Sequence, residues 1–384
     1  MTMVILMFCP QFRPMVGGAE RQAEKLAAAL AEAGCRVTIL TPRLDPDSPD
    51  REAINGVSIE RFPLIDLARR YPAPGVALLN IPYILWQIAR AVRSRLKGSD
   101  VLHCHIASLQ TAGAALAGRM AGVPVLCKAA TGDERSDLGK IENTGASGRL
   151  VAWLVRSLVA TWVATTAAVK EALIRAGVDP RNIVHIPNGV DLPDEPGIRP
   201  PADRVRRFLY LGRLSTNSQR DVPTLVKAFD RLATIYPDLE LAIVGGGDLF
   251  EETKRLAGTC AARGRIHLPG FDRPEKWLAW ADCFVLPSRR EGLSNALLEA
   301  MAVGLPCIAN DISPNREVLA NGEAGILVPV GDADALVQAM RRVVTVPGEC
   351  EQWRQRGRKR AEEVYSIDRI AGEYRQLYAE LLKA

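Results

Sequence analysis

The sequence has few aromatic residues and no long uncharged apolar run. Residues 150–168 come nearest to such a run, but Arg156 interrupts it, so no transmembrane helix is expected. Residues 1–8 carry no positive charge ahead of a short apolar stretch, so no signal peptide is expected. Aromatic residues make up 5% of the chain and do not alternate with basic ones, which argues against a nucleic-acid partner. These absences predict a cytoplasmic protein.

Paired cysteines are also lacking. The eight cysteines lie far apart without a Cys-x-x-Cys pair, which predicts reduced, mostly buried thiols rather than a disulfide framework or a zinc ribbon. His103 and His105 share one face of a predicted strand, but the sequence offers no third ligand. The Asp-x-Asp strings at 45–47 and 332–334 fit a polar loop and a helix cap. We therefore expect no metal site.

The net charge of +5 is small, and it is unevenly distributed. Residues 1–190 hold 22 basic and 16 acidic side chains, whereas the remainder holds 27 and 28. This asymmetry indicates an anionic partner for the first half, such as a membrane surface or a phosphorylated acceptor. Residues 80–97 mix apolar and basic side chains in a way that fits docking on anionic lipid. An ordinary helix with a solvated basic face is the alternative.

Short Val-, Ile- and Leu-rich runs alternate with helical periodicity along nearly the whole chain, which predicts an α/β protein with parallel sheets. Strands are expected at 4–8, 37–40, 57–61, 101–104, 123–127, 162–164, 183–186, 208–211, 239–244, 266–268, 283–286, 307–309 and 326–328. Four prolines between residues 192 and 203 predict an exposed linker. The domains expected are 1–190, a linker at 191–206, a second domain at 207–365, and a closing helix at 366–384. Two Rossmann-like lobes of this kind place a ligand site in the cleft between them.

Three groups of residues could carry chemistry. Gly17 and Gly18 precede a predicted helix, where backbone N–H groups can meet an anion, although a plain tight turn would use the same residues. Arg213 and Arg220 follow a predicted strand and suit a phosphate, although a solvated basic loop is the alternative. The strongest pattern is EGLSNALLEAMA (291–302), which places one glutamate in a loop and a second in the following helix.

That last string closely resembles the hallmark of retaining family-four glycosyltransferases of the GT-B fold, the glycosyl transferases group 1. The resemblance covers nearly the whole chain. It includes GGAE (17–20), IPNGVD (186–191), GRL (212–214), IVGGG (243–247) and GILVP (325–329), in this order.

The resemblance implies roles for individual residues. Arg213 and Arg220 would bind the donor diphosphate, Glu299 the ribose, and Glu291 hydroxyls of the donor sugar. His105 would lie near the sugar, with His105, Glu291 and Arg213 as the catalytic set. The full donor-binding set would be Gly17, Gly18, Arg213, Arg220, Gly245, Phe271, Glu291, Leu293, Ser294, Asn295 and Glu299. The closing helix would cross back to the first lobe.

The sequence departs from the family pattern at two places. Family members usually carry Lys a few residues after the Arg, whereas this chain has Arg220 after a longer loop. The loop at 128–133, where many relatives begin with His, supplies Lys128, Thr131 and Asp133 as candidate acceptor contacts.

The function that the resemblance implies is transfer of a hexosyl unit from a UDP- or GDP-sugar to a saccharide or lipid-linked acceptor. It would be retaining and independent of metal, need no cofactor beyond the nucleotide-sugar donor, and serve polysaccharide or cell-envelope glycan synthesis. Peripheral association with the inner face of the membrane fits such an acceptor. The alternatives are a nucleotide-sugar epimerase of the same fold and a catalytically silent nucleotide-sugar-binding partner.

Overall fold

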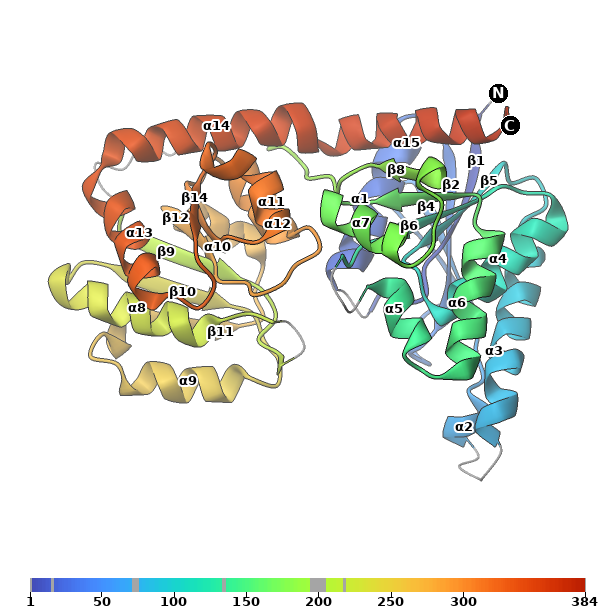
Figure 1. The fold of residues 1–384 in the computed structure, drawn as a ribbon, viewed down its shortest axis with the longest axis horizontal. Coiled ribbons are helices and arrows are strands. Elements are labelled where there is room, and N and C mark those ends of the chain that lie inside the picture. The colour runs from blue at the N-terminus through green and yellow to red at the C-terminus, as the bar shows by residue number, and fades with distance from the viewer. Residues whose placement is uncertain are drawn as a thin grey trace. The chain divides into compact units, whose positions relative to one another are not determined.

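The computed structural model describes residues 2–14, 17–70, 76–132, 136–193, 205–216 and 219–383, without the side chains of residues 76–78. The chain divides into two compact units, Met1–Gly189 with Ile367–Ala384, and Val190–Ser366. Each unit is built around its own parallel sheet (Figure 1). Most of the linker expected at 191–206 lies outside the described residues.

The first unit has an eight-stranded sheet with the order β3-β4-β2-β1-β5-β6-β7-β8. All neighbours pair in parallel except β3 and β4, which are antiparallel. The order reverses at β1 and β5, which makes their carboxyl ends the switch point where ligands of such sheets bind. The strands are β1 (Val4–Phe8), β2 (Arg36–Arg43), β3 (Arg51–Ile54), β4 (Val57–Pro63), β5 (Val101–His105), β6 (Val125–Ala129), β7 (Thr161–Ala164) and β8 (Ile183–His185).

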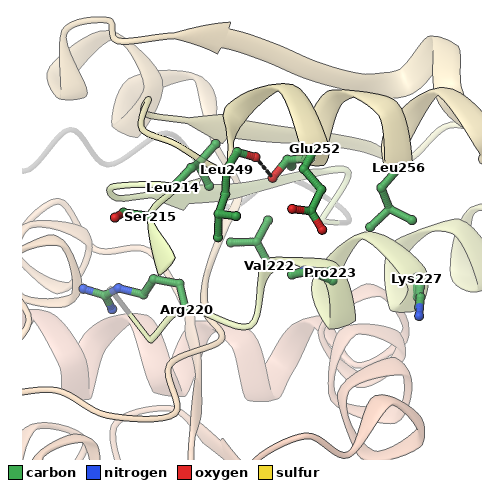
Figure 2. Close-up of a pocket in the computed structure, with 10 residues that line it drawn as sticks. Leu214, Ser215, Arg220, Val222, Pro223, Lys227, Leu249, Glu252 and Leu256 are labelled. Atoms are coloured by element: carbon green, nitrogen blue, oxygen red, sulfur yellow. Dashed lines mark hydrogen bonds between the residues drawn. The ribbon is translucent and has the colours of Figure 1, made fainter. Parts of the chain in front are cut away.

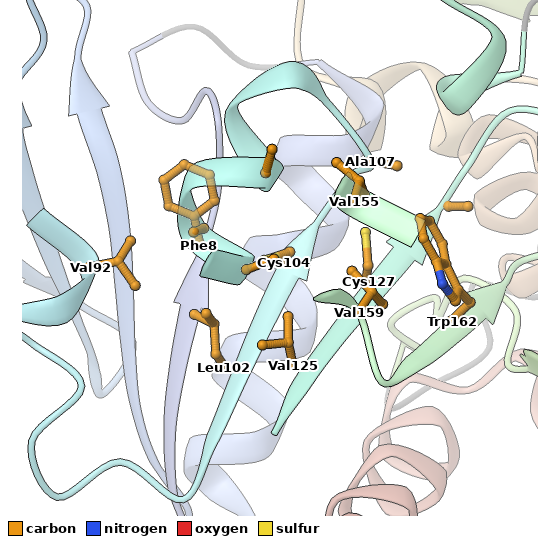
Figure 3. Packing of buried hydrophobic residues seen from close by; sticks show 14 of the residues in the cluster. Phe8, Val92, Leu102, Cys104, Ala107, Val125, Cys127, Val155, Val159 and Trp162 are labelled. Carbon is orange, nitrogen blue, oxygen red and sulfur yellow. The ribbon is translucent and has the colours of Figure 1, made fainter. Parts of the chain in front are cut away.

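Helices cover both faces of this sheet. One face packs against α3, α4 and α6, and Figure 3 shows part of this core, where Phe8, Cys104 and Trp162 meet the aliphatic side chains of the helices. The other face packs against α1 and α15, so the last helix of the chain belongs to the first unit. The helices are α1 (Gly18–Glu32), α2 (Leu67–Arg70), α3 (Val76–Arg93), α4 (Leu109–Ala121), α5 (Asp137–Glu142), α6 (Ala146–Leu158), α7 (Ala167–Arg175) and α15 (Ile367–Leu381).

The second unit has a six-stranded, all-parallel sheet with the order β11-β10-β9-β12-β13-β14. Its switch point lies between β9 and β12. The strands are β9 (Arg207–Leu211), β10 (Glu240–Val244), β11 (Ile266–Gly270), β12 (Cys283–Leu286), β13 (Cys307–Asn310) and β14 (Ile326–Val328). The helices are α8 (Val222–Ile235), α9 (Phe250–Thr259), α10 (Pro274–Trp280), α11 (Asn295–Ala302), α12 (Ser313–Val318), α13 (Ala333–Thr345) and α14 (Pro347–Tyr365).

The predicted α/β class with two Rossmann-like units is confirmed, and each expected strand has its counterpart within a few residues. The edge strand β3 was missed, because two of its four residues REAI are charged and it carries no apolar run. All eight cysteines are buried and unpaired. Among the described helices, none is long and apolar enough to cross a membrane.

Candidate functional site

The predicted donor-binding residues of the second unit follow four strands that lie side by side. Arg213 follows β9, Gly245 follows β10, Phe271 follows β11, and Glu291 follows β12. Because the strands are parallel neighbours, their carboxyl ends meet at one edge of the sheet. The fold thus places along one edge of the sheet residues that are up to 78 positions apart in the sequence.

Arg213 presents an exposed guanidinium at this edge. Its backbone is held in place, because its carbonyl accepts a hydrogen bond of 3.3 Å from the Tyr210 hydroxyl. Tyr210 itself is buried in the core below the loop. An exposed guanidinium on an anchored backbone suits the bidentate binding of phosphate oxygens.

Arg220 and Glu291, which the sequence places in separate roles, form an ion pair with each other. Only 17% of the Arg220 side chain and 10% of the Glu291 side chain are exposed, so water screens this pair weakly. Ser288 joins them, since its hydroxyl donates to Glu291 at 2.9 Å and accepts from Arg220. Burial lowers the pKa of Arg220, but an arginine retains its charge at any physiological pH.

The backbone brings this pair together through a contact that the sequence analysis missed. Residues 219–221 pair with residues 287–289 in a short antiparallel bridge, in which the Asp221 N–H donates to the Pro287 carbonyl at 2.6 Å. The Arg289 guanidinium then bonds to the Asp221 carboxylate at 2.8 Å. Neither residue has a sequence signal for this role, because the contact joins two loops 68 positions apart.

The glycine run at 245–247 allows three chain segments to approach closely. A Cβ atom at Gly245 would lie 1.9 Å from the Gly212 carbonyl oxygen, and one at Gly247 would lie 2.1 Å from the Leu214 carbonyl oxygen. Gly245 also has a φ of +144°, which favours glycine. The Phe271 ring packs on Gly246 and is 79% exposed, which is unusual for a large apolar side chain. This exposed ring is a suitable surface for stacking a nucleotide base.

The helix α11 begins as the sequence predicted. Ser294 caps it by accepting a hydrogen bond of 3.4 Å from the Leu297 N–H, and Asn295 is its first residue. Leu293 and Ser294 are buried, and Glu299 lies in the second turn, partly exposed. The amino terminus of this helix therefore faces the same strand end as Glu291, where its dipole favours an anion.

A pocket of about 240 Å³ lies beside this site, between α8 and α9. Leu214, Val222, Leu249 and Leu256 form its apolar lining, and Glu252 and Lys227 supply charge. Figure 2 shows the Arg220 guanidinium turned away from Val222 and Pro223. The pocket is smaller than the 300–1,000 Å³ usual for a ligand of drug size, so we do not assign it to the donor.

Asp248 is a further residue that the sequence analysis missed. Its carboxylate accepts hydrogen bonds from the Thr216 hydroxyl at 2.8 Å and from the Thr216 N–H at 3.3 Å. The hydrogen bonds of Ser215 and Thr216 lower the pKa of Asp248 to about 2. The loop that follows Arg213 is therefore tied to the loop that follows the glycine run.

In the first unit, the structure modifies the expectation for Gly17 and Gly18. The Gly17 N–H is not open to an anion, because it donates to the Glu20 carboxylate at 2.8 Å in a capping box. Gly17 has an extended backbone with a φ of −108°, so its conformation does not require glycine. Gly18 does lie where the sequence analysis expected a helix to begin. It is the first residue of α1, the helix that follows the switch-point strand β1.

His105 and Lys128 are register partners on β5 and β6, and both are buried. Burial and the neighbouring Lys128 lower the pKa of His105 well below its ordinary value, although a backbone hydrogen bond with Ala19 opposes this shift. Burial lowers the pKa of Lys128 to about 7. At neutral pH the imidazole is thus uncharged, and the lysine is close to its titration midpoint.

The candidate acceptor residues do not share one environment. Lys128 is 3% exposed at the carboxyl end of β6. The Thr131 hydroxyl donates to Asp137 at 2.7 Å, and Asp137 also accepts from the Ala130 N–H at 2.8 Å. Thr131 therefore helps to fold its own loop, whereas Asp133 lies outside the described residues.

Both Asp-x-Asp strings make local hydrogen bonds to the backbone. Asp332 caps α13 by accepting from the Ala335 N–H at 2.9 Å, and Asp45 accepts from the Asp47 N–H at 3.1 Å within its loop. Within the described ranges, no three His, Cys, Asp or Glu side chains are grouped so that they could hold a metal ion.

Two family models match this chain. Residues 17–189 match the glycosyl transferase 4-like domain, and residues 194–360 match the glycosyl transferases group 1. The boundary between the two matches lies close to the boundary between the two compact units.

Similar proteins have been characterised in bacteria. A phosphatidyl-myo-inositol mannosyltransferase of Mycobacterium leprae is 29% identical over 350 residues, which are 88% of this chain and 86% of that protein. One of Mycolicibacterium smegmatis is 37% identical over 163 residues, and this match spans only 42% of that protein. The crystal structure of Anabaena HepE in complex with UDP has a TM-score of 0.76 at 16% identity, covering 98% of this chain and 100% of HepE.

Proposed function

The chain belongs to the glycosyl transferases group 1 and has the GT-B fold, and from this we propose that it transfers a hexosyl unit from a UDP- or GDP-sugar with retention of configuration. The acceptor is a saccharide or a lipid-linked saccharide, in the synthesis of a polysaccharide or a cell-envelope glycan. The observation that carries this proposal is that Arg213, Gly245, Phe271 and Glu291 follow four neighbouring strands and lie along one edge of the second sheet.

Each part of this edge corresponds to one part of a nucleotide sugar. The exposed Phe271 ring offers a surface to the base, and Glu299 offers two oxygen atoms to the ribose hydroxyls. Arg213 and the amino terminus of α11 supply positive potential for the diphosphate. The glycine run lets the backbone come close to the ligand.

The same arrangement supports loss of the diphosphate from the sugar. The transition state develops negative charge on the leaving diphosphate, and preorganised cations stabilise that charge. Arg213 is exposed, and Arg220 follows it by seven positions in the loop after β9. Retention then follows if the acceptor hydroxyl attacks from the face that the diphosphate leaves, with a diphosphate oxygen taking its proton.

Glu291 is not suited to act as a covalent nucleophile. Its carboxylate accepts from Ser288 and forms an ion pair with Arg220, and both contacts reduce the electron density available for attack. We assign it instead to hydroxyl groups of the donor sugar, and His105 of the first unit to the same reaction. We further propose that the reaction needs no metal ion.

The experiment that tests the donor is thermal stability of the purified protein with UDP, GDP, ADP and their common sugars. A ligand at about a hundred times its dissociation constant adds roughly 2.7 kcal/mol to the free energy of unfolding. We expect one nucleotide family to raise the melting temperature, and Glu299→Ala to abolish that rise. Glu251→Ala, which removes an exposed glutamate of α9, is the matched control and should retain it.

Incubation with the donor alone tests the reaction class. A transferase hydrolyses the donor slowly at most, whereas an epimerase converts it to another nucleotide sugar without an acceptor. No stabilisation by any nucleotide would contradict the proposal.

We also propose that the first unit docks on an anionic lipid surface. Its α3, α4 and α6 form one layer over the sheet, and each helix exposes large apolar side chains to solvent. These are Leu79, Trp86, Leu116, Met120, Leu150 and Trp153, exposed by 41% to 69%. Arg90 lies 5.6 Å from the Trp86 ring centroid, so the apolar surface carries basic groups. Two of its relatives are, by their names, phosphatidyl-myo-inositol mannosyltransferases, which favours a membrane-bound acceptor.

A further inference from the structure

A buried polar cluster lies between the sheet of the first unit and its last helix, α15. His103 and His105 come from β5, and Tyr374 and Tyr378 come from α15. Three of the four side chains are 0% exposed and His105 is 3% exposed. Burying polar groups at such depth costs folding free energy unless they are hydrogen-bonded.

Tyr378 makes the one side-chain hydrogen bond that the described structure shows within this cluster. Its hydroxyl lies 2.7 Å from Nδ1 of His103. Burial and Lys128 lower the pKa of His103 to about 3, so the ring is neutral and exists as one of two tautomers. The hydrogen bond at Nδ1 determines which ring nitrogen carries the proton.

Tyr374 is one helical turn away and makes a different contact. Its ring stacks on His103 with centroids 5.2 Å apart and an interplanar angle of 23°. Its hydroxyl is buried and has no hydrogen-bond partner among the described residues. The two tyrosines thus offer a natural comparison, because only one hydroxyl bonds to His103.

The His103 ring also lies next to the His105 ring. The two residues are two positions apart on β5 and lie on the same face of the strand. Their ring centroids are 5.5 Å apart with an interplanar angle of 37°. Nε2 of His103 and Nδ1 of His105 are both buried without a partner in the described part of the chain. A change in the tilt or tautomer of His103 therefore acts directly on the ring beside it.

We propose that Tyr378 is a positioning residue for His105, acting through the orientation and tautomer of His103. The inference rests on the proposed function in one respect, namely that His105 takes part in transfer. It extends that function by assigning a role to the closing helix, which also packs on the sheet through the apolar side chains of Ile370, Ala371 and Leu377.

Imidazole NMR tests the coupling without any substrate. The chain has four histidines, His103, His105, His185 and His267, so ring ¹⁵N spectra can be assigned from single substitutions. Tyr378→Phe keeps the ring and removes the hydrogen bond, and we expect it to change the tautomer of His103 and to shift the ring resonances of His105. Tyr374→Phe should leave the tautomer of His103 unchanged. Ring resonances of His105 that do not move in Tyr378→Phe would overturn the proposal.

Kinetics test whether the coupling serves the reaction. The substrate is the UDP-, GDP- or ADP-sugar that stabilises the protein most, and the readout is release of nucleotide from it. We expect Tyr378→Phe to lower kcat by about tenfold with KM nearly unchanged, and Tyr374→Phe to behave as the parent. In a His105→Ala background, Tyr378→Phe should have no further effect on kcat, whereas a purely structural loss would be additive.

The outcomes separate this inference from the proposed function. If His105→Ala releases nucleotide at the parent rate, the assigned role of His105 is wrong, and the NMR result alone decides the positioning. If His105→Ala is impaired while Tyr378→Phe is not, the proposed function stands and the positioning role is refuted.

Discussion

Arg220 and Glu291 form an ion pair at the point where the strand order of the second sheet reverses. One residue follows β9 and the other follows β12, and Ser288 contacts both. A donor diphosphate near Arg220 would therefore compete with Glu291 for the guanidinium. If the proposed roles hold, binding of the phosphate by Arg220 is linked to the placement of Glu291 at the sugar through this one contact.

Glu291→Ala should destabilise the protein by about 2 to 3 kcal/mol, because it leaves the largely buried guanidinium of Arg220 without its carboxylate. The double variant Arg220→Ala with Glu291→Ala should cost less than the two single variants together. Urea unfolding of the four proteins measures this coupling. Additive losses would show that the pair contributes nothing as a pair.

Gly245→Ala should abolish nucleotide-dependent stabilisation and lower the free energy of unfolding by about 2 kcal/mol or more. The new methyl group would lie 1.9 Å from the Gly212 carbonyl oxygen, so the loops after β9 and β10 could not keep their approach. Thermal melts with and without the nucleotide provide the measurement.

Gly258→Ala is the control for that substitution. Gly258 lies in α9, and a Cβ atom there would meet no atom within 4 Å. We expect this variant to bind nucleotide normally and to gain about 0.5 to 1 kcal/mol of stability, because alanine restricts the unfolded chain. Normal binding by Gly245→Ala as well would contradict the role assigned to the glycine run.

The sequence was sufficient for those parts of the site that depend on local order. A glycine run after one strand, or Ser294 at the start of α11, is fixed by residues within a few positions. When strands pair in parallel, the motifs that follow them lie at the same edge of the sheet. The donor-binding roles of residues in the second unit come from the family resemblance and stay a prediction, and the fold brings four of them to one edge of the sheet.

Contacts between distant segments could not be predicted in this way. Tyr378 and His103 are 275 positions apart, and nothing in helical periodicity distinguishes a tyrosine that bonds to a histidine from one that only packs. Another such contact involves Arg95, which belongs to the mixed apolar and basic stretch 80–97 that the sequence analysis assigned to a lipid-facing surface. Its guanidinium bonds instead to Glu60 at 2.7 Å.

Lys128 should make the stability of the protein depend on pH just above neutrality. Its folded pKa of about 7 is below the value of 10.5 for an ordinary lysine, so between these values the unfolded chain binds more protons than the folded one. The free energy of unfolding should therefore rise with pH in this window, by up to about 1.4 kcal/mol per pH unit.

Lys128→Met should lack this rise, and the difference between the two proteins isolates the lysine. Measurements are best made from pH 7 to 8.5, because the buried cysteines oppose the trend once unfolded thiols begin to ionise near pH 9. Parallel curves for the parent and Lys128→Met would mean that the lysine keeps an ordinary pKa in its buried position.

The lipid surface leads to a prediction about α3. Arg90 and Arg93 are exposed on this helix, whereas Arg95 is occupied by Glu60. Replacing Arg90 and Arg93 by alanine should weaken sedimentation with vesicles that contain anionic phospholipid by about tenfold or more, since each basic group near such a surface contributes about 1 kcal/mol.

A matched pair of substitutions separates a local surface from general charge. Lys254→Ala with Arg255→Ala removes the same charge from exposed positions of α9 in the second unit. This control should bind vesicles as the parent does, because α9 lacks the exposed tryptophans that accompany the basic groups of α3 and α6. Equal losses in both variants would mean that net charge alone drives adsorption, and binding of the parent to neutral vesicles with the same affinity would remove the electrostatic argument.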